Sequence, residues 1–256
     1  MTLRFSSLGS GSEGNALIVQ VRDSALMMDC GFGLADTERR LARVGLIPEN
    51  LDAIVVTHEH SDHIGGVAQF ARKHKIPVWL THGTANVLNE RSLSPSLLHF
   101  VDPHEAFSVG DIHVTPFLVP HDAYEPVQYV FSDGEVRLGV LTDTGTITEH
   151  IESTLSGCDA LVLECNHDLE MLMSGPYPAS LKKRVAGRFG HLDNLTAASL
   201  LTSIDCSRLE HVLAAHLSKQ NNLPQLATAA LARALSCGQD WIGIAGQASG
   251  FSWREI

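Results

Sequence analysis

The sequence predicts an α/β fold in which two mixed β-sheets are sandwiched between helices, formed by a single domain over residues 1–256. Of the 256 residues, 44% are apolar and 18% are charged, which is enough apolar chain to bury a large core. Short apolar segments typical of strands alternate with helical segments along the whole chain. No repeat, low-complexity segment or change in composition interrupts this pattern. Two sheets between helical layers accommodate this order of elements.

The first third of the chain is predicted to contain short strands and two helices. Gly-rich or polar turns separate the strands. The first helix should end at Gly45, with Pro48 beyond it, and Pro77 opens a strand. The predicted order is strand 3–8, strand 15–21, strand 25–30, helix 35–45, strand 52–57, helix 63–75 and strand 77–81.

The middle of the chain is rich in strand patterns, and the last part alternates strands with helices. The segment "SDGE" separates the last two middle strands and predicts a hairpin turn. The middle strands are predicted at 106–109, 112–119, 127–132 and 135–142. The last part is predicted as helix 146–156, strand 159–165, helices 178–188 and 194–203, strand 211–216, helix 223–236, and strands 241–245 and 249–253.

The cysteine pattern and the apolar runs bear on location. The five cysteines are an odd number, widely spaced and without a CxxC pair, which favours reduced thiols over a disulfide framework. The N-terminal segment lacks the apolar core of a secretory signal, and no apolar run approaches the length that crosses a bilayer. We therefore expect a cytoplasmic protein with no membrane partner, and the sequence leaves its oligomeric state open.

The most informative segment is "VVTHEHSDHIGG" at residues 55–66. It places His58, His60, Asp62 and His63 within six positions, directly after a predicted buried strand. Alternate residues of an extended segment point the same way, so His58 and His60 can project together, whereas Asp62 and His63 lie near the first turn of the following helix. Imidazole nitrogen and carboxylate oxygen suit zinc, and also manganese or iron. The segment therefore predicts a metal site.

Three further ligand-type residues each follow an apolar run. His121 follows "VTPFLVP", Asp143 follows "RLGVLT", and His216 follows "HVLAA". A lone His or Asp in such a place is usually a turn residue, so only the combination with residues 58–63 marks them as ligand candidates. Strand ends are where loops bring distant residues together.

The segment "THEHSDHIGG" matches the HxHxDH signature of the metallo-β-lactamase superfamily, and the later His, Asp and His follow the order of that family. The segments "FSSLGSGSEGNA", "ECNHD", "GHLDN" and "HLSKQNN" more closely resemble the YycJ/WalJ-type branch, which is grouped with nucleases and phosphodiesterases such as tRNase Z. The resemblance extends over essentially the whole chain. It implies an αββα sandwich with a dinuclear metal site at one edge.

The resemblance also implies a role for each ligand. His58, His60 and His121 would hold one divalent metal, Asp62, His63 and His216 a second, and Asp143 would bridge both. Zinc is expected first, with manganese or iron as alternatives. Two such cations sharing a hydroxide would lower the pKa of the bound water toward neutrality and stabilise negative charge on a phosphoryl oxygen. The catalytic set would then comprise Asp62 and Asp143 together with two histidines, His167 and His191. Either histidine could bind a phosphate or protonate a leaving oxygen, and a buried or helix-capping histidine fits each of them about as well.

Three segments are candidates for substrate binding. The Gly/Ser loop "LGSGSEGN" could offer backbone N–H groups to an anion, although an ordinary hairpin turn fits it nearly as well. The segment "HLSKQNN" could contact substrate or cap the next helix. The run "LKKRVAGR" at 181–188 would make a cationic strip on one helix, with Arg184 and Arg188 sharing a face, or simply a solvated surface. The candidate residues are Ser10, Gly11, Ser12, Asn15, Lys182, Lys183, Arg184, Lys219, Asn221 and Asn222.

Two functions remain open from the sequence. The first is a metal-dependent phosphodiesterase or exonuclease that acts on DNA or RNA through a metal-bridging hydroxide, as the branch resemblance and the 181–188 segment favour. The second is hydrolysis of a small ester, lactone, thioester or cyclic phosphate, which the formal net charge of −11 suits better because an acidic surface repels polyanions. The expected partner is a nucleic acid or a small phosphodiester.

Overall fold

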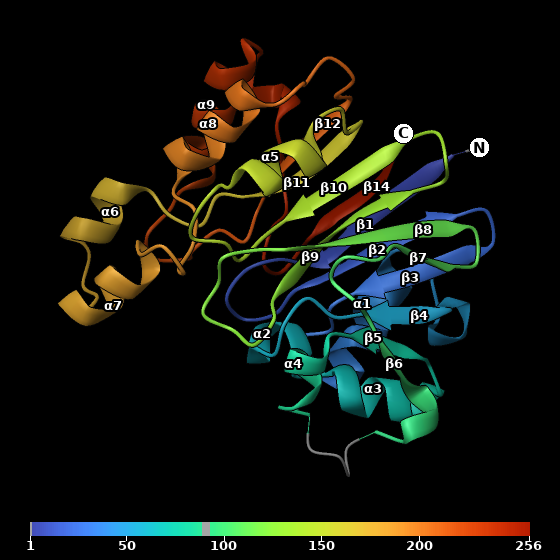
Figure 1. The fold of residues 1–256 in the computed structure, drawn as a ribbon. Helices are drawn as coiled ribbons and strands as arrows, with labels where there is room; N and C mark the ends of the chain where they lie inside the picture. Colours follow the sequence, from blue (N-terminus) through green and yellow to red (C-terminus); the bar gives the residue numbers. More distant parts are fainter. Residues whose placement is uncertain (1, 89–92) are drawn as a thin grey trace.

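The computed structural model describes residues 2–88 and 93–256 and consists of two facing β-sheets between two layers of helices (Figure 1). Each sheet contains seven strands, and each mixes parallel with antiparallel pairs. The predicted α/β class with two mixed sheets is therefore confirmed. Within the described ranges, no helix combines the length and the apolar character needed to cross a membrane.

The first sheet is antiparallel from β14 to β3 and parallel from β3 to β6. Its strands lie in the order β14 (Phe251–Glu255), β1 (Leu3–Gly9), β2 (Ala16–Val21), β3 (Ser24–Met28), β4 (Ala53–Val55), β5 (Val78–Leu80) and β6 (Leu98–Phe100). The change from antiparallel to parallel pairing aligns the carboxyl ends of β3, β4 and β5 at one edge.

The second sheet has the same plan. It is parallel from β13 to β10 and antiparallel from β10 to β7. The strands lie in the order β13 (Gly243–Ile244), β12 (His211–Ala215), β11 (Ala160–Glu164), β10 (Arg137–Leu141), β9 (Val127–Ser132), β8 (Ile112–Leu118) and β7 (Phe107–Val109). The carboxyl ends of β10, β11 and β12 therefore also meet at one edge.

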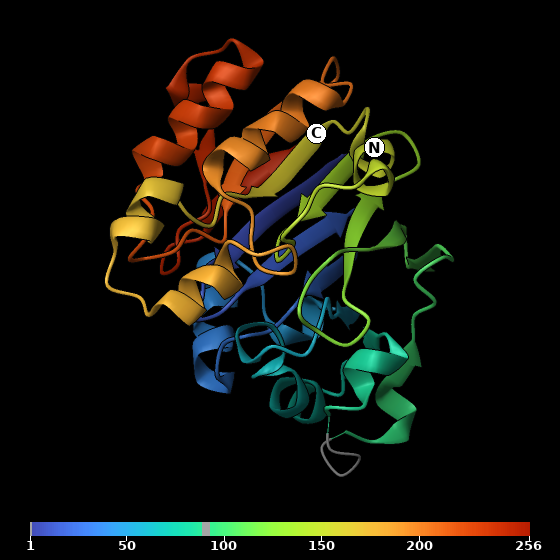
Figure 2. The ribbon, with the colours of Figure 1, turned by 60° about the vertical axis from the view of Figure 1, so that its left-hand side comes forward.

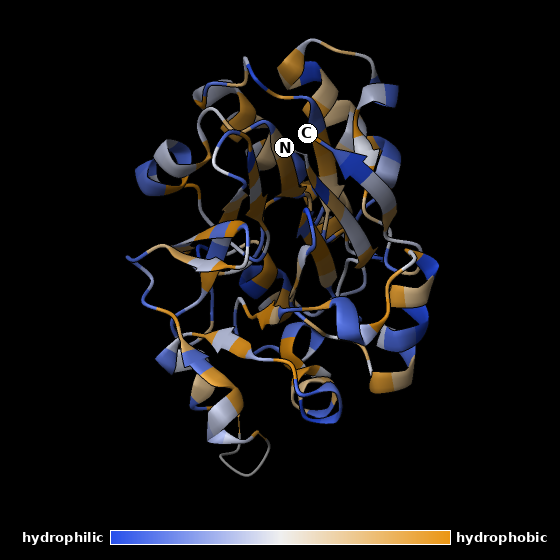
Figure 3. Ribbon diagram, turned by 90° about the vertical axis from the view of Figure 1, so that its right-hand side faces the viewer, coloured by the Kyte–Doolittle hydropathy of each residue, from blue (hydrophilic) through white to orange (hydrophobic). Residues whose placement is uncertain are grey.

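Alternating side chains of both sheets fill the space between them. Phe5 and Leu26 from the first sheet and Tyr129 and Phe131 from the second are fully buried in one cluster there. Successive residues of a strand point to opposite faces of the sheet, so one set of apolar strand residues fills the middle of the molecule and the other packs under the helices (Figure 3). Burial of this cluster removes a large apolar area from water, which is the main force holding the two sheets together.

Helices cover the outer faces of both sheets. Leu41 and Phe70 belong to the outer cluster of the first sheet, and Leu155 and Leu231 to that of the second. The first layer contains α1 (Leu34–Arg43), α2 (Ser61–Ile64), α3 (Val67–His74) and α4 (His82–Ala85), and the second contains α5 (Glu149–Leu155), α8 (Asn194–Ser203) and α9 (Pro224–Leu235). Two short helices, α6 (Leu169–Ser174) and α7 (Ala179–Val185), lie to one side of the sheets (Figures 1 and 2).

Two predicted helices are interrupted. The helix expected at 63–75 divides into α2 and α3 at Gly65–Gly66, because the chain there passes against the segment after β3. The Gly66 N–H donates to the Cys30 carbonyl at 2.7 Å, and a Cβ on Gly66 would lie 1.9 Å from the Phe32 carbonyl oxygen. The helix expected at 178–188 ends at Val185, because Gly187 and Gly190 form a turn that brings the His191 N–H to the Val185 carbonyl at 2.8 Å.

The remaining strands and helices match the prediction to within a few residues at their ends. Among the α-helices and β-strands of the described residues, the short elements α4, β6 and α6 were not predicted. The strand expected at 241–245 is reduced to Gly243–Ile244 because a turn of 3-10 helix occupies Gln239–Trp241, and the last strand is displaced to Phe251–Glu255.

Candidate metal centre

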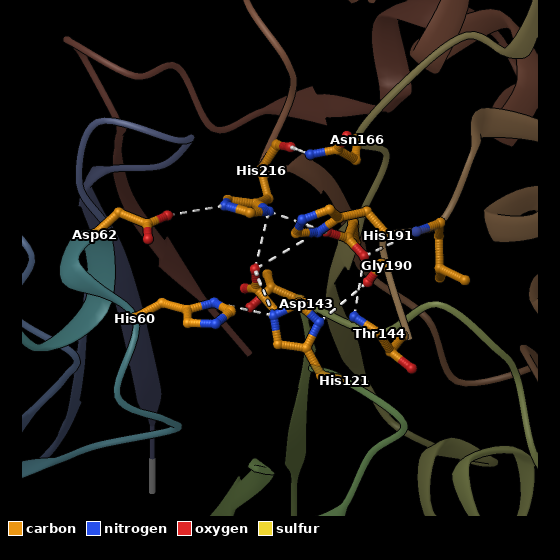
Figure 4. Close-up of polar contacts among 12 residues, drawn as sticks. His60, Asp62, His121, Asp143, Thr144, Asn166, Gly190, His191 and His216 are labelled. Carbon is orange, nitrogen blue, oxygen red and sulfur yellow. Dashed lines mark hydrogen bonds and ion pairs between the residues drawn. The ribbon is translucent and has the colours of Figure 1, made fainter. Parts of the chain in front are cut away.

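Seven histidine and aspartate side chains from four separate segments converge where the strands end. Figure 4 shows Asp143 in the middle of this group, with His60, His121, His191 and His216 around it. These segments follow the carboxyl ends of β4, β8, β10 and β12. The edge formed by the carboxyl ends of parallel strands is the usual place for a binding site in α/β proteins.

The first cluster is His58, His60 and His121, whose ligand atoms lie within 4.8 Å of one another. The Nδ1 of His60 and the Nε2 of His121 face each other at 3.2 Å. The other nitrogen of each ring bonds a main-chain carbonyl, His60 Nε2 to Asp122 O at 3.2 Å and His121 Nδ1 to Gly190 O at 3.1 Å. A carbonyl oxygen only accepts, so a ring that carries one proton carries it on that side, and two such rings direct their lone pairs at each other across 3.2 Å.

His58 completes this cluster in the same manner. Its Nδ1 bonds the Thr57 hydroxyl at 2.9 Å, and that hydroxyl donates onward to the buried Asp29 carboxylate at 2.9 Å. The opposite nitrogen, Nε2, is buried and has no hydrogen-bond partner. Burial lowers the pKa of His58 well below its ordinary value, and the neighbouring His63 adds to this, so the ring is neutral and its Nε2 carries a lone pair.

The second cluster is Asp62, His63 and His216. Here the nitrogen of each histidine that points away from the cluster bonds a carboxylate: His63 Nδ1 donates to Asp29 Oδ2 at 2.8 Å, and His216 Nδ1 donates to Glu164 Oε1 at 2.9 Å. The inner nitrogens face Asp62 Oδ2, His63 Nε2 at 3.5 Å and His216 Nε2 at 3.4 Å. Carboxylates behind ligating histidines fix the ring orientation and raise its basicity.

Asp143 lies between the two clusters. Its ligand oxygen lies in one group with His58 and His63 and in another with Glu164, His191 and His216. The carboxylate is 2% exposed, and its Oδ2 has no hydrogen-bond donor although it lies 3.2 Å from His63 Nε2. Burial would raise the pKa of Asp143, but the surrounding His216 and His63 outweigh burial and hold it well below its ordinary value. The side chain is therefore an anion placed between two sets of nitrogen ligands.

Three of these strand-end residues adopt left-handed backbone conformations. The φ angles are +61° at Asp29, +52° at Asp143 and +54° at His216. Such conformations cost about 1–3 kcal/mol each in non-glycine residues and concentrate at functional sites. Here the backbone turns sharply where β3, β10 and β12 end, which directs the side chains into the centre.

The sequence prediction missed two carboxylates behind the ligands, Asp29 and Glu164. Asp29 is 2% exposed and accepts hydrogen bonds from Thr57 as well as from His63. Glu164 is fully buried, and its pKa is held at about 2 because His191 and His216 outweigh the effect of burial. Both residues carry an acidic side chain at or just after the end of an apolar strand, which is the signal that identified Asp143. The same rule applied to "ALMMD" and "ALVLE" would have found them.

His191 lies beside the centre and contacts its carboxylates. Its Nδ1 donates to Glu164 Oε1 at 2.9 Å and lies 3.6 Å from Asp143 Oδ1. Burial lowers the pKa of His191, but the Glu164 carboxylate outweighs burial and raises it. The bond to Glu164 leaves Nε2 as the ring nitrogen that can meet a substrate oxygen.

A cavity of about 360 Å³ opens over the centre. Its lining includes His60, Asp62, Asp143, His191 and His216, so a bound molecule would touch the predicted ligands directly. His167, the second predicted catalytic histidine, is not part of that lining and is 1% exposed, with its Nδ1 buried and unpartnered. Its catalytic role stays a prediction without support from the geometry.

Most N–H groups of the Gly/Ser loop after β1 bond within the protein, and two residues of the loop contact predicted metal ligands. The N–H groups of residues 9, 10, 11, 13, 14 and 15 all donate within the protein. Asn15 Nδ2 lies 3.1 Å from His63 Nε2, and Ser10 Oγ accepts from the His216 N–H at 2.9 Å. The expectation for this loop is therefore wrong for Gly11, whose N–H bonds Asn15. Of the four predicted residues in this loop, only Ser12 lines the cavity.

In the two other predicted substrate-binding segments, some of the predicted residues line the cavity and others do not. Among their predicted residues, Arg184 and Asn221 line the cavity. The others are engaged elsewhere or point outward: Lys182 Nζ donates to the Met173 carbonyl, Lys183 is exposed, Lys219 pairs with Glu13, and Asn222 Nδ2 bonds the Cys165 carbonyl. Because α7 ends before Arg188, the shared helix face predicted for Arg184 and Arg188 is wrong. Arg184 instead bonds Asp122 at 2.6 Å.

Comparisons with known proteins agree with this fold and site. A family model described as "Beta-lactamase superfamily domain" matches residues 25–216. The chain is 36% identical over 237 residues to exodeoxyribonuclease YycJ of Bacillus anthracis. The matched region covers 92% of this chain and 90% of the relative. The chain is 32% identical over 245 residues to exodeoxyribonuclease WalJ of Streptococcus pneumoniae serotype 2 strain D39, spanning 94% and 91%.

Solved structures show the same architecture. The metallo-β-lactamase-fold protein YhfI of Bacillus subtilis matches with a TM-score of 0.75 over 100% of both chains, at 18% sequence identity. At that identity the likeness concerns the fold alone.

Proposed function

Since the chain belongs to the metallo-β-lactamase-fold members of the beta-lactamase superfamily, we propose that it is a metal-dependent phosphodiesterase that removes nucleotides from the ends of DNA. Two relatives, each matched over more than nine-tenths of this chain, are described as exodeoxyribonucleases, which supports DNA as the substrate class. The seven ligand-type residues of the centre support the metal dependence.

The donor atoms fit two metal ions. His58, His60 and His121 would hold one ion, Asp62, His63 and His216 the other, and Asp143 would bridge them. The observation that carries this assignment is that His60 Nδ1 and His121 Nε2 lie 3.2 Å apart with their lone pairs directed at each other. Two nitrogens facing each other repel unless a cation lies between them, and two nitrogens bound tetrahedrally to zinc at about 2.0–2.1 Å are about 3.3 Å apart. The unpartnered His58 Nε2 and Asp143 Oδ2 are the other open ligand positions.

Nitrogen and oxygen donors without a thiolate suit zinc, and manganese and iron are the alternatives. When bound, such ions supply Lewis acidity toward a phosphoryl oxygen and a water that is acidic enough to act near neutral pH. The protein supplies the rest. Glu164 and Asp29 accept from Nδ1 of His216 and of His63, which holds each ring in the tautomer whose Nε2 carries a lone pair. His191, held by Glu164, contributes Nε2 at the cavity, where it would bind a phosphate oxygen or give a proton to the leaving oxygen.

The test is a panel of substrates with protein reconstituted in zinc, manganese or iron. We expect end-labelled single-stranded and double-stranded DNA to be shortened stepwise from one end, with bis-p-nitrophenyl phosphate hydrolysed more slowly. Elemental analysis of the active protein should find two metal ions per chain. Absence of cleavage of DNA, RNA and bis-p-nitrophenyl phosphate with every metal would reject phosphodiester hydrolysis.

A second candidate is hydrolysis of a small ester, lactone, thioester or cyclic phosphate. The formal net charge of −11 favours it, and so does the pairing of Arg184 with Asp122, which neutralises a guanidinium group that lines the cavity. A lactone and a cyclic dinucleotide in the same panel distinguish the two candidates.

A further inference from the structure

Helix α7 presents an apolar face that the protein core does not cover. None of the seven residues Ala179–Val185 is buried. Leu181 and Val185 are four residues apart and so share one face of the helix. Both line the cavity above the metal centre, together with Tyr177, which lies two residues before the helix begins. The apolar side of this helix therefore faces the cavity.

The rest of the cavity lining has the opposite character. It consists mainly of the predicted metal ligands, His191, and polar residues such as Ser12, Ser218 and Asn221. Arg184, one residue before Val185, adds a guanidinium group at the same cavity. A molecule that fills this space should therefore have a flat or apolar part next to a strongly anionic part. A nucleotide has this composition, because its base is apolar on both faces and its phosphate is charged.

Tyr177, Leu181 and Val185 form an apolar wall of the cavity, and this wall is held rigidly against the centre. A Cβ on Gly145, two residues after Asp143, would lie 2.4 Å from the Gly187 carbonyl oxygen, so the turn after α7 is packed directly on that loop. The Val185 carbonyl accepts from the His191 N–H at 2.8 Å, and the Gly190 carbonyl bonds His121 Nδ1 at 3.1 Å. The turn that ends α7 therefore also positions a ligand and a catalytic candidate. A wall that is ordered before binding costs little entropy when substrate arrives.

We propose that Tyr177, Leu181 and Val185 form a subsite that stacks the base of the terminal nucleotide and so places its phosphodiester at the metal centre. This inference rests on the proposed DNA exonuclease function and specifies how the strand end is recognised. The cavity volume of about 360 Å³ is at the small end of ligand pockets, which run from about 300 to 1,000 Å³, so it suits one nucleotide. Every base has a π-face, so the subsite should accept all four bases.

The test compares oligodeoxynucleotides that differ only in the terminal base. One substrate carries a normal terminal nucleotide, and its partner carries a tetrahydrofuran abasic residue, placed at the 5′ end in one pair and at the 3′ end in another. With the metal-loaded protein we expect loss of the base at the attacked end to raise KM about 5- to 150-fold, the range for one stacked base. The other end should show no effect.

Variants assign that effect to the wall. Tyr177→Ala and Leu181→Ala should cleave both substrates with similar KM, whereas Tyr177→Phe should keep the difference because it keeps the ring. The matched control is Leu195→Ala, which removes a leucine that is 66% exposed and does not line the cavity. Circular dichroism and thermal unfolding establish that each variant is folded.

A binding measurement supplies a readout apart from turnover. An oligonucleotide with a terminal 2-aminopurine and a phosphorothioate linkage should lose fluorescence on binding to the metal-loaded parent, and should lose much less with Tyr177→Ala. Equal KM for normal and abasic ends, with DNA still cleaved by the parent, would overturn the subsite and leave the proposed function intact. Absence of oligonucleotide cleavage by the parent would overturn both.

Discussion

Replacement of Glu164 by Gln should disable the centre although Glu164 is not one of the proposed metal ligands. The Glu164 carboxylate accepts four hydrogen bonds. Its Oε1 accepts from Nδ1 of His191 and of His216, both at 2.9 Å, and its Oε2 accepts from the N–H groups of Thr144 at 3.2 Å and Leu192 at 3.0 Å. A Gln side chain has almost the same shape but only one acceptor oxygen. In either orientation of the amide, its NH₂ group therefore faces two donors.

The size of the effect follows from that count. Two buried donors left without an acceptor cost about 1–3 kcal/mol each, or about 2–6 kcal/mol together. For a chain of this size, 1 kcal/mol corresponds to about 2–4 °C in Tm, so the variant should unfold at least about 4 °C lower. If the amide NH₂ faces the histidines, His216 must turn its Nδ1 into an acceptor and carry the proton on Nε2, which removes a metal ligand. Loss of such a supporting group typically weakens metal binding about 10- to 100-fold.

The assay combines metal titration by competition with a chromogenic chelator, thermal unfolding, and hydrolysis of bis-p-nitrophenyl phosphate. The control is Glu38→Gln, which makes the same chemical change in a partly exposed carboxylate that pairs with Lys73 and His74. The control should change neither metal affinity nor activity. Metal affinity within twofold of the parent, with an unchanged Tm, would refute the role given to Glu164.

Three further substitutions test the other parts of the site. Asp143→Ala should abolish turnover and lower the metal content below two ions per chain, because it removes the anion shared by the two clusters; a variant that retains both ions by elemental analysis would contradict the bridging role. His191→Ala should keep the metal content nearly unchanged while lowering the rate about 10²- to 10⁴-fold, as for a lost acid–base group, and a fully active variant would return His191 to a structural role. Arg184→Ala should weaken DNA binding and reduce the slope of log affinity against log salt by about 0.7–0.9, the contribution of one phosphate contact. Lys183→Ala, a change on the exposed side of the same helix, should leave the slope unaltered.

The sequence by itself determined the fold class and the identity of the candidate ligands. Short apolar strands and amphipathic helices follow from local residue order, which is why most elements were predicted to within a few residues. The cluster His58–His63 is contiguous, so its proximity needs no tertiary information. His121, Asp143 and His216 were found because each follows an apolar strand, and the carboxyl ends of those strands meet at one edge in the folded sheets.

Tertiary structure decided which groups surround those ligands and what the substrate would touch. Glu164 bonds histidines 27 and 52 residues away, and Asp29 bonds His63 at a separation of 34 residues. Such pairs depend on strand order, which a local pattern does not encode. The same applies to α7. Its basic residues looked like a continuous strip, yet the turn at Gly187–Gly190 ends the helix at Val185 and directs Leu181 and Val185, together with Arg184, to the cavity. Local residue order determines which chemistry each side chain offers. Long-range packing determines its neighbours and its orientation, and so whether that chemistry is available at the metal centre.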